Sequence, residues 1–176
     1  MKKKFVSVTD CPVARALETV GEGWSILILR DAFQGMARFD EFQQSLGIAP
    51  NILSRRLSHL TEAGLFVRRR YSDRPPRYEY VLTPKALDFF PVLVTLFAWG
   101  NKHSVPEGEA IVLARRGDIA PLDPMLVNAT DGHPITPADA VLVPGRRASR
   151  GMRQRLASLK AMNPGVRNPD VSPVGG

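Results

Sequence analysis

Apolar residues recur at helical spacing through the first part of the chain, and glycines separate the successive runs. A short helix is predicted after Cys11-Pro12, because proline is favoured in the first helical turn. Its apolar side chains share one face that we expect to pack inward: Val13, Ala16, Leu17 and Val20. The next run, residues 24–30, is apolar on almost every side, which suits either a buried strand or a buried helix. Its continuation to Gly35 favours a helix.

Two amphipathic segments follow, joined by a tight turn. In residues 39–46 the apolar positions repeat at i, i+3 and i+7, and Gly47 stands where a left-handed residue commonly ends a helix. Residues 50–63 are polar on one side, and on the other side three leucines fall within roughly 60° of one another. These are Leu53, Leu57 and Leu60. The pattern predicts a helix, a tight turn and a second helix.

A two-stranded hairpin is predicted next. Residues 65–71 are rich in β-branched and aromatic side chains, residues 72–76 have the composition of a turn, and residues 77–82 alternate as a strand does. After the hairpin, Thr83-Pro84 starts a long apolar helical stretch, which Pro91 is expected to kink or split in two. This order of elements predicts a mainly α fold with a small β-hairpin wing, the winged helix-turn-helix class.

The composition changes after the first hundred residues, and we expect four parts. Residues 1–10 form a basic N-terminal arm, and residues 11–103 form the winged helix-turn-helix domain with its dimerisation helix. Residues 104–144 mix short apolar runs with prolines and other turn residues, which predicts a small β-rich C-terminal appendage. Residues 145–176 are predicted to be a basic, largely flexible tail with a short helix near residues 150–162.

Composition also excludes several classes of protein. No apolar run approaches the ~20 residues of a membrane-spanning helix, and no secretory leader pattern opens the chain, so we expect a cytoplasmic protein with no membrane partner. The single cysteine, Cys11, excludes an internal disulfide. Three histidines, His59, His103 and His133, have no ligand partners at metal spacing, and no phosphate loop or nucleophile motif occurs. We therefore expect no metal, no cofactor and no enzymatic activity.

Positive charge is concentrated in blocks. The chain has 24 Lys and Arg against 17 Asp and Glu, a net charge of +7. Residues 51–80 hold seven arginines against three acidic residues, and residues 145–176 hold seven basic residues against one acidic residue. Such blocks indicate a surface that binds a polyanion, together with a basic tail.

The polar side of residues 50–63 is the candidate surface for reading DNA, because the major groove admits an α-helix. It carries Asn51, Ser54, Arg55, Arg56 and Ser58. Arg55 lies almost opposite the leucines and suits guanine, whereas Asn51 suits adenine. Arg56, nearer the flank, is expected to meet the DNA backbone. The alternative is an amphipathic surface helix whose polar face is merely solvated.

Arginines on and around the predicted hairpin form the second candidate surface. They are Arg68, Arg70, Arg74 and Arg77, and arginines in such a place engage phosphates or a narrow minor groove. Strand alternation turns Arg69 to the opposite face from Arg68 and Arg70. A basic hairpin behind a helix–turn–helix is a narrower signal of DNA binding than a basic patch alone.

Several motifs, in order over residues 11–100, resemble those of the HxlR-type winged-helix transcriptional regulators. They are residues 11–13, 23–30, 38–42, 53–57, 62–65, 75–83, 91–93 and 99–100. The resemblance implies a homodimeric repressor or activator that binds double-stranded DNA at promoters. The chain departs from the pattern at Ala49, where relatives commonly have a serine that caps the recognition helix, and at Gly23, where a lysine usually precedes the tryptophan.

Dimerisation is predicted from the last apolar helix. Apolar groups lie on more than one side of it, and a domain this small covers only one of those sides. The candidate interface residues are Phe89, Phe90, Leu93, Leu96, Phe97 and Trp99. A twofold dimer would present two recognition helices to a palindromic site. The alternative is that the segment after residue 103 covers this surface.

Cys11 is a candidate redox residue. It stands at a predicted helix N-terminus, where the helix dipole favours the thiolate. The resemblance implies the same, because a cysteine at this place serves as a redox sensor in some members of the family. Burial as a small apolar residue is the alternative.

Two other functions compete with sequence-specific regulation of transcription. One is a non-specific or single-stranded nucleic-acid binder, although the regular aromatic platforms of that mode are not evident. The other is a small-molecule-binding or thiol-reactive protein on a winged-helix scaffold. Neither a small-molecule effector nor the sensed signal is identified by the residues alone.

Overall fold

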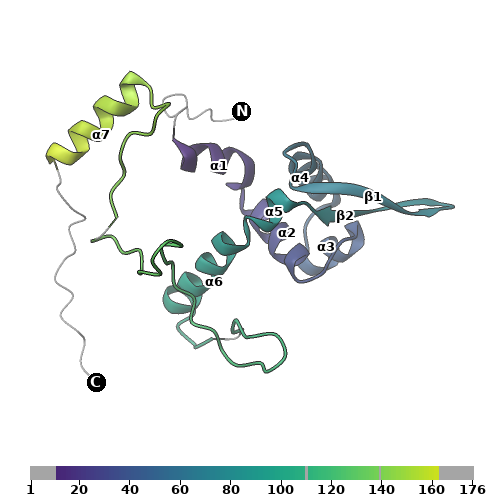
Figure 1. Ribbon diagram of the computed structural model, residues 1–176. Helices are drawn as coiled ribbons and strands as arrows, with labels where there is room; N and C mark the ends of the chain where they lie inside the picture. Colours follow the sequence, from purple (N-terminus) through teal and green to yellow (C-terminus); the bar gives the residue numbers. More distant parts are fainter. Residues whose placement is uncertain (1–10, 110, 139, 163–176) are drawn as a thin grey trace. The chain divides into compact units, whose positions relative to one another are not determined.

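The computed structural model of the protein describes residues 11–109, 111–138 and 140–162 (Figure 1). The chain forms two compact units, and the division between them falls after Pro124. The predicted arm, residues 1–10, and the end of the predicted tail lie outside the described residues. No helix among the described residues is long and apolar enough to cross a membrane.

The first unit begins with four helices: α1 (Pro12–Val20), α2 (Gly23–Phe33), α3 (Phe39–Leu46) and α4 (Pro50–Glu62). The run that suited strand or helix is therefore helical, as its length indicated. Gly47 ends α3 at φ 59°, in the left-handed region that favours glycine. The fully buried side chains are contributed mainly by α2, α3, α4 and the first strand: Ile28, Leu29, Phe42, Leu53, Leu57, Leu60 and Phe66.

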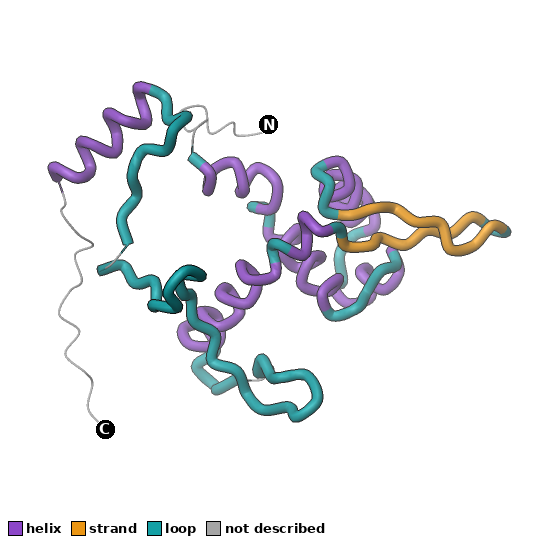
Figure 2. The backbone as a smooth tube through the Cα atoms, viewed as in Figure 1, coloured by secondary structure: helices purple, strands orange, loops and turns teal. Residues whose placement is uncertain are grey.

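The hairpin consists of β1 (Phe66–Asp73) and β2 (Pro76–Leu82), paired antiparallel (Figure 2). Tyr80 packs edge-on against the core ring of Phe66, with ring centroids 6.2 Å apart. Its backbone N–H also donates to the carbonyl of Ala37 (2.7 Å), which fastens the hairpin to the start of α3. The helices and this hairpin confirm the predicted winged helix-turn-helix class.

Two helices follow the hairpin, α5 (Pro84–Leu87) and α6 (Phe90–Ser104), so the long apolar stretch is split as its proline predicted. Thr83 holds the start of α5, because its hydroxyl accepts from the N–H of Ala86 (3.3 Å) and donates to the carbonyl of Gly64 (2.7 Å).

The apolar face of α1 does not pack inward as predicted. Val13 is 67% exposed and Leu17 is 47% exposed, and only Val20 of this helix is buried. The spacing correctly indicated a helix with one apolar side. Within the first unit, no other described element covers that side.

The segment expected to be β-rich contains two isolated antiparallel bridges, Ala114 with Pro121 and Val127 with Pro134. Its described residues form no longer strand, and the prolines give a reason, since proline donates no hydrogen bond to a ladder. The second unit ends in α7 (Arg150–Met162), over the residues where a short helix was predicted.

Candidate nucleic-acid interface

The recognition helix α4 exposes one polar side. Its three leucines are fully buried, and this orients Asn51, Ser54, Arg55 and Ser58 outward, where all four are exposed. The amide oxygen of Asn51 accepts from the backbone N–H of Ile52 (2.9 Å). Packing of the leucine stripe is therefore what places the predicted base-reading side chains on a common surface.

The N-terminus of α4 has no side-chain cap. Ala49 occupies the N-cap, and Pro50 follows it in the first helical position. Proline has no N–H to satisfy there, but the remaining amides of the first turn keep the positive end of the helix dipole. The capping serine suggested by the family pattern is absent, and the positive helix end remains suited to a phosphate.

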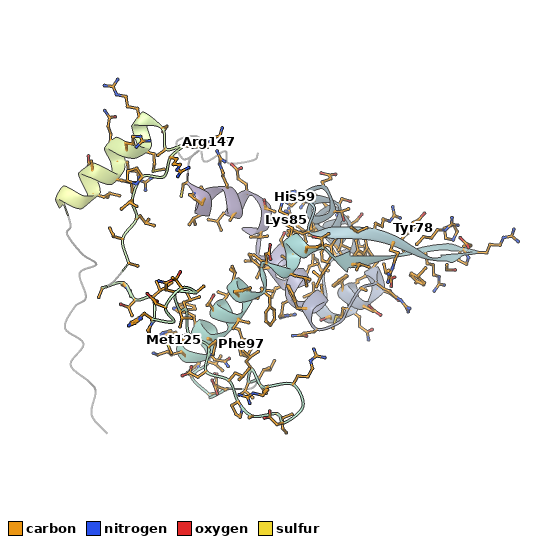
Figure 3. All side chains as sticks on the ribbon, viewed as in Figure 1. His59, Tyr78, Lys85, Phe97, Met125 and Arg147 are labelled. Carbon is orange, nitrogen blue, oxygen red and sulfur yellow. The ribbon has the colours of Figure 1, made fainter. Side chains whose placement is uncertain are left out.

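Arg56 is not on the outward surface, in contrast to its predicted contact with the DNA backbone. Its side chain is only 12% exposed, and Nη2 lies 3.2 Å from Oε2 of Glu22, in the link between α1 and α2. The neighbouring His59 approaches the carbonyl of Thr19 at the end of α1 through Nε2, at 3.0 Å (Figure 3). Both side chains tie α4 to α1 and its link, which gives Arg56 a structural role as the alternative to the predicted DNA contact.

The wing arginines divide into engaged and unengaged groups. Arg68 stacks on the ring of Tyr78, with Cζ 3.7 Å from the ring centroid (Figure 3). Arg70 forms an ion pair with Asp73, with its Nε 3.1 Å from Oδ1 of the carboxylate. By contrast, the exposed guanidinium groups of Arg74 and Arg77 have no partner within the described part of the chain.

Arg69 was predicted to face the other side of the hairpin. It forms an ion pair with Glu79, with its Nε 2.6 Å from Oε1. Of the four predicted wing contacts, Arg74 and Arg77 are thus the side chains that already stand free for phosphate. Arg68 and Arg70 would have to exchange an intramolecular partner for a phosphate oxygen.

Glu41 fixes the first turn of the helix that precedes the recognition helix. Its carboxylate accepts hydrogen bonds from the backbone N–H groups of Ala37 (2.8 Å) and Arg38 (2.9 Å). These bonds, the one from Ala37 first, hold the pKa of Glu41 below its ordinary value of 4.5. An acidic residue three positions after the N-cap is the sequence signal of this arrangement, and it could have indicated the role of Glu41.

The six predicted interface residues, at the N-cap of α6 and along it, fall into three pairs. Phe89 and Leu93 pack against the core of their own unit. Leu96 and Trp99 are exposed, at 47% and 60%. Val92, which is 50% exposed, continues their line one turn earlier. The remaining two are Phe90, half exposed with its ring 5.1 Å from that of Phe33, and Phe97, which is partly buried.

The apolar side of α1 adds a second uncovered surface that sequence analysis assigned to the core. Cys11 stands at the N-cap of the same helix, half-buried and with a free thiol. No group of three or more His, Cys, Asp or Glu gathers among the described residues.

These features define a winged helix-turn-helix protein whose recognition helix and wing offer polar and basic side chains. A family model described as HxlR-like helix-turn-helix matches residues 19–107. The chain therefore belongs to the HxlR-like helix-turn-helix family, and it is a transcriptional regulator of the helix-turn-helix type.

Individual relatives agree with this assignment. An HTH-type transcriptional regulator of Mycobacterium tuberculosis (strain ATCC 25618 / H37Rv) is 42% identical over 147 residues, which are 83% of this chain and 90% of the relative. The crystal structure of PA1607, described as a transcription factor, has a TM-score of 0.72 at 40% identity over 79% of this chain and 98% of that chain. A second transcription factor structure, PA1374 from Pseudomonas aeruginosa, has a TM-score of 0.60 at 51% identity, over 82% of this chain and 99% of that chain. The redox regulator HypR in its reduced form has a TM-score of 0.51 at 28% identity, over 55% of this chain and 97% of that chain.

Proposed function

We propose that this regulator binds double-stranded DNA sequence-specifically, as a homodimer, at palindromic promoter sites. The observation that carries the proposal is the polar side of α4, where Asn51, Arg55 and Ser58 are exposed opposite three fully buried leucines. A helix with this arrangement fits the major groove with its base-reading side chains outward. Arg74 and Arg77 on the wing supply unpaired positive charge for the adjacent phosphates.

The proposed dimer is supported by uncovered apolar surface. Leu96 and Trp99 on α6, and Val13 and Leu17 on α1, are each between 47% and 67% exposed. Burying such surface against a second copy is favourable by about 25 cal/mol per Å² of apolar area. A twofold dimer would place its two recognition helices about one helical turn of DNA apart, roughly 34–36 Å.

The test is a selection of bound duplexes from a random pool, using the full chain. Sequencing is expected to return a palindrome with half-sites about one DNA turn apart, and analytical ultracentrifugation is expected to show a dimer. Gel shifts should then show preference for that duplex over its single strands and over a scrambled duplex. Equal affinity for all three would favour the non-specific or single-stranded binder and overturn the proposal.

A redox response is the second element of the proposal. Cys11 is a free thiol at the N-cap of α1, the helix whose uncovered face we assign to the dimer. A solved structure similar to this chain is that of the redox regulator HypR. Oxidation of Cys11, as a mixed adduct or a disulfide between two chains, would therefore act close to the interface.

A further inference from the structure

A cleft of about 600 Å³ lies within the first unit, between the C-terminal half of α6 and residues of the segments 109 and 111–124. Phe97, labelled in Figure 3, is on its helical wall. Pockets for small ligands commonly have volumes of about 300–1,000 Å³. The space is therefore large enough for an organic molecule, and neither the recognition helix nor the wing contributes to it.

The wall opposite α6 is held in place by directed bonds. The side-chain amide of Asn101 donates to the carbonyl of Ile111 (2.9 Å) and to Oε1 of Glu109 (3.2 Å). Within the wall, the N–H of Leu122 donates to the carbonyl of Leu113 (2.8 Å). These bonds fasten the segment both to the helix and to itself, so the cleft is formed before any ligand binds.

The lining is apolar and aromatic for much of its surface. Phe97 and Trp99 come from α6, and Val112, Leu113 and Leu122 come from the facing segment. Aromatic faces attract cations as well as apolar groups. The lining therefore suits a molecule that is largely hydrocarbon and that carries a positive charge.

The charged groups around the cleft favour the same sign. Two carboxylates, Glu109 and Asp123, line it, against one permanent cation, Lys102, and the imidazole of His103, whose ring centroid lies 5.5 Å from that of Trp99. The last turn of α6 also lies here, and the negative end of a helix dipole favours a cation. Lys102 is exposed, and its long stem lets the ammonium group extend into solvent.

We propose that this cleft binds a small apolar organic cation, of the class of aromatic amines and quaternary onium compounds. The inference that this ligand is an effector rests on the proposed function. Trp99 lines the cleft and also belongs to the exposed α6 surface assigned to the dimer. An occupied cleft would thus alter the dimer surface, and through it the spacing of the two recognition helices.

The binding test uses tetraphenylphosphonium as the probe and tetraphenylborate, which has nearly the same shape and the opposite charge, as its control. In the full chain carrying Trp24→Phe, Trp99 is the one remaining tryptophan. The phosphonium ion is expected to bind with one equivalent per chain by calorimetry and to change the fluorescence of Trp99, with affinity well above that of the borate. No saturable binding, or tighter binding of the borate at this site, would overturn the proposal.

Charge variants test the assignment of the site. Glu109→Gln and Asp123→Asn should each lower the affinity for the phosphonium ion by about two- to fivefold, the effect of one partly exposed charge. Lys102→Met should raise that affinity by a similar factor. Glu107→Gln is the matched control, because Glu107 is exposed nearby but does not line the cleft. Equal losses of phosphonium affinity in Glu107→Gln and Glu109→Gln would overturn the assignment of the site.

The effector role has its own readout. On a selected duplex, phosphonium at a concentration equal to its wild-type Kd is expected to change the DNA affinity of the wild type and to have a weaker effect on Asp123→Asn, whose cleft is less occupied at that concentration. Unchanged DNA affinity at full occupancy would overturn the effector role. If the protein bound no DNA, the proposed function would fail, whereas the calorimetric result would still decide whether the cleft binds the cation.

Discussion

Replacing Arg56 tests the main reassignment on the recognition helix. If Arg56 holds α4 to the α1–α2 link, Arg56→Met should leave DNA binding intact, because methionine keeps an apolar stem in the same largely buried place. If Arg56 contacts the DNA backbone, the same change should weaken binding to every duplex and reduce the salt slope by about 1. Arg55→Met is the matched control, since Arg55 is the adjacent arginine and is exposed.

The expected change in stability follows from the surroundings of the pair. Glu22 is 63% exposed, so the ion pair is screened and contributes about 0.2–1 kcal/mol. Nε of Arg56 is buried and has no hydrogen-bond partner among the described residues, a cost on the order of 1 kcal/mol that Arg56→Met relieves. The two effects nearly cancel, so the free energy of unfolding of Arg56→Met should lie within about 1 kcal/mol of the wild type.

Removing the other partner should have a larger effect. Glu22→Gln leaves a guanidinium group that is 12% exposed without its counter-charge, which should cost about 1–2 kcal/mol. The assay is urea unfolding followed by circular dichroism, at one fixed protein concentration because dimerisation would contribute to apparent stability. The reasoning would be refuted if Glu22→Gln left the free energy of unfolding unchanged while Arg56→Met lowered it strongly.

Four further predictions concern the wing, the dimer, the thiol and acid stability. Arg55→Ala should lose about 1–3 kcal/mol of discrimination at one base position across a duplex panel, whereas Arg74→Ala should weaken all duplexes alike and lower the salt slope by about 1. Leu96→Glu, which puts a charge on exposed apolar surface, should sediment as a monomer where the wild type is a dimer. Peroxide should change the DNA affinity of the wild type but not of Cys11→Ser. The pKa of Glu41 is lowered by backbone hydrogen bonds, so its contribution to stability is complete above pH 4.5 and is lost as the pH falls through the lowered value. Glu41→Gln should therefore flatten the acid side of a urea-unfolding series.

Each of these expectations has a contrary result. Equal losses on every duplex for Arg55→Ala and Arg74→Ala would mean that the assigned roles are wrong. A dimeric Leu96→Glu would place the interface elsewhere, and an unchanged wild type after peroxide would end the redox hypothesis. If the free energy of unfolding fell equally steeply with acid in the wild type and in Glu41→Gln, other carboxylates would control the acid dependence.

Local structure was largely predictable from residue types and spacing. The leucines of α4 indicated both the helix and its buried side, Gly47 indicated the end of α3, and residues 150–162 indicated α7. The spacing of α1 was equally clear as a helix but was misleading about burial. Periodicity reports that one side of a helix is apolar, and it carries no information on whether that side meets the same chain.

The amino-acid sequence alone determined the order of elements, the polar side of the recognition helix and the concentration of arginine around it, because these depend on neighbours within a few residues. Only the tertiary structure decided which arginines are free. Arg56 meets Glu22, 34 positions earlier, and Arg68 meets the ring of Tyr78 across the hairpin, whereas Arg74 and Arg77 meet nothing in the described structure. Coulomb attraction and cation–π contact act over a few ångströms in space, so the count of charges along a chain does not reveal which of them folding has already paired.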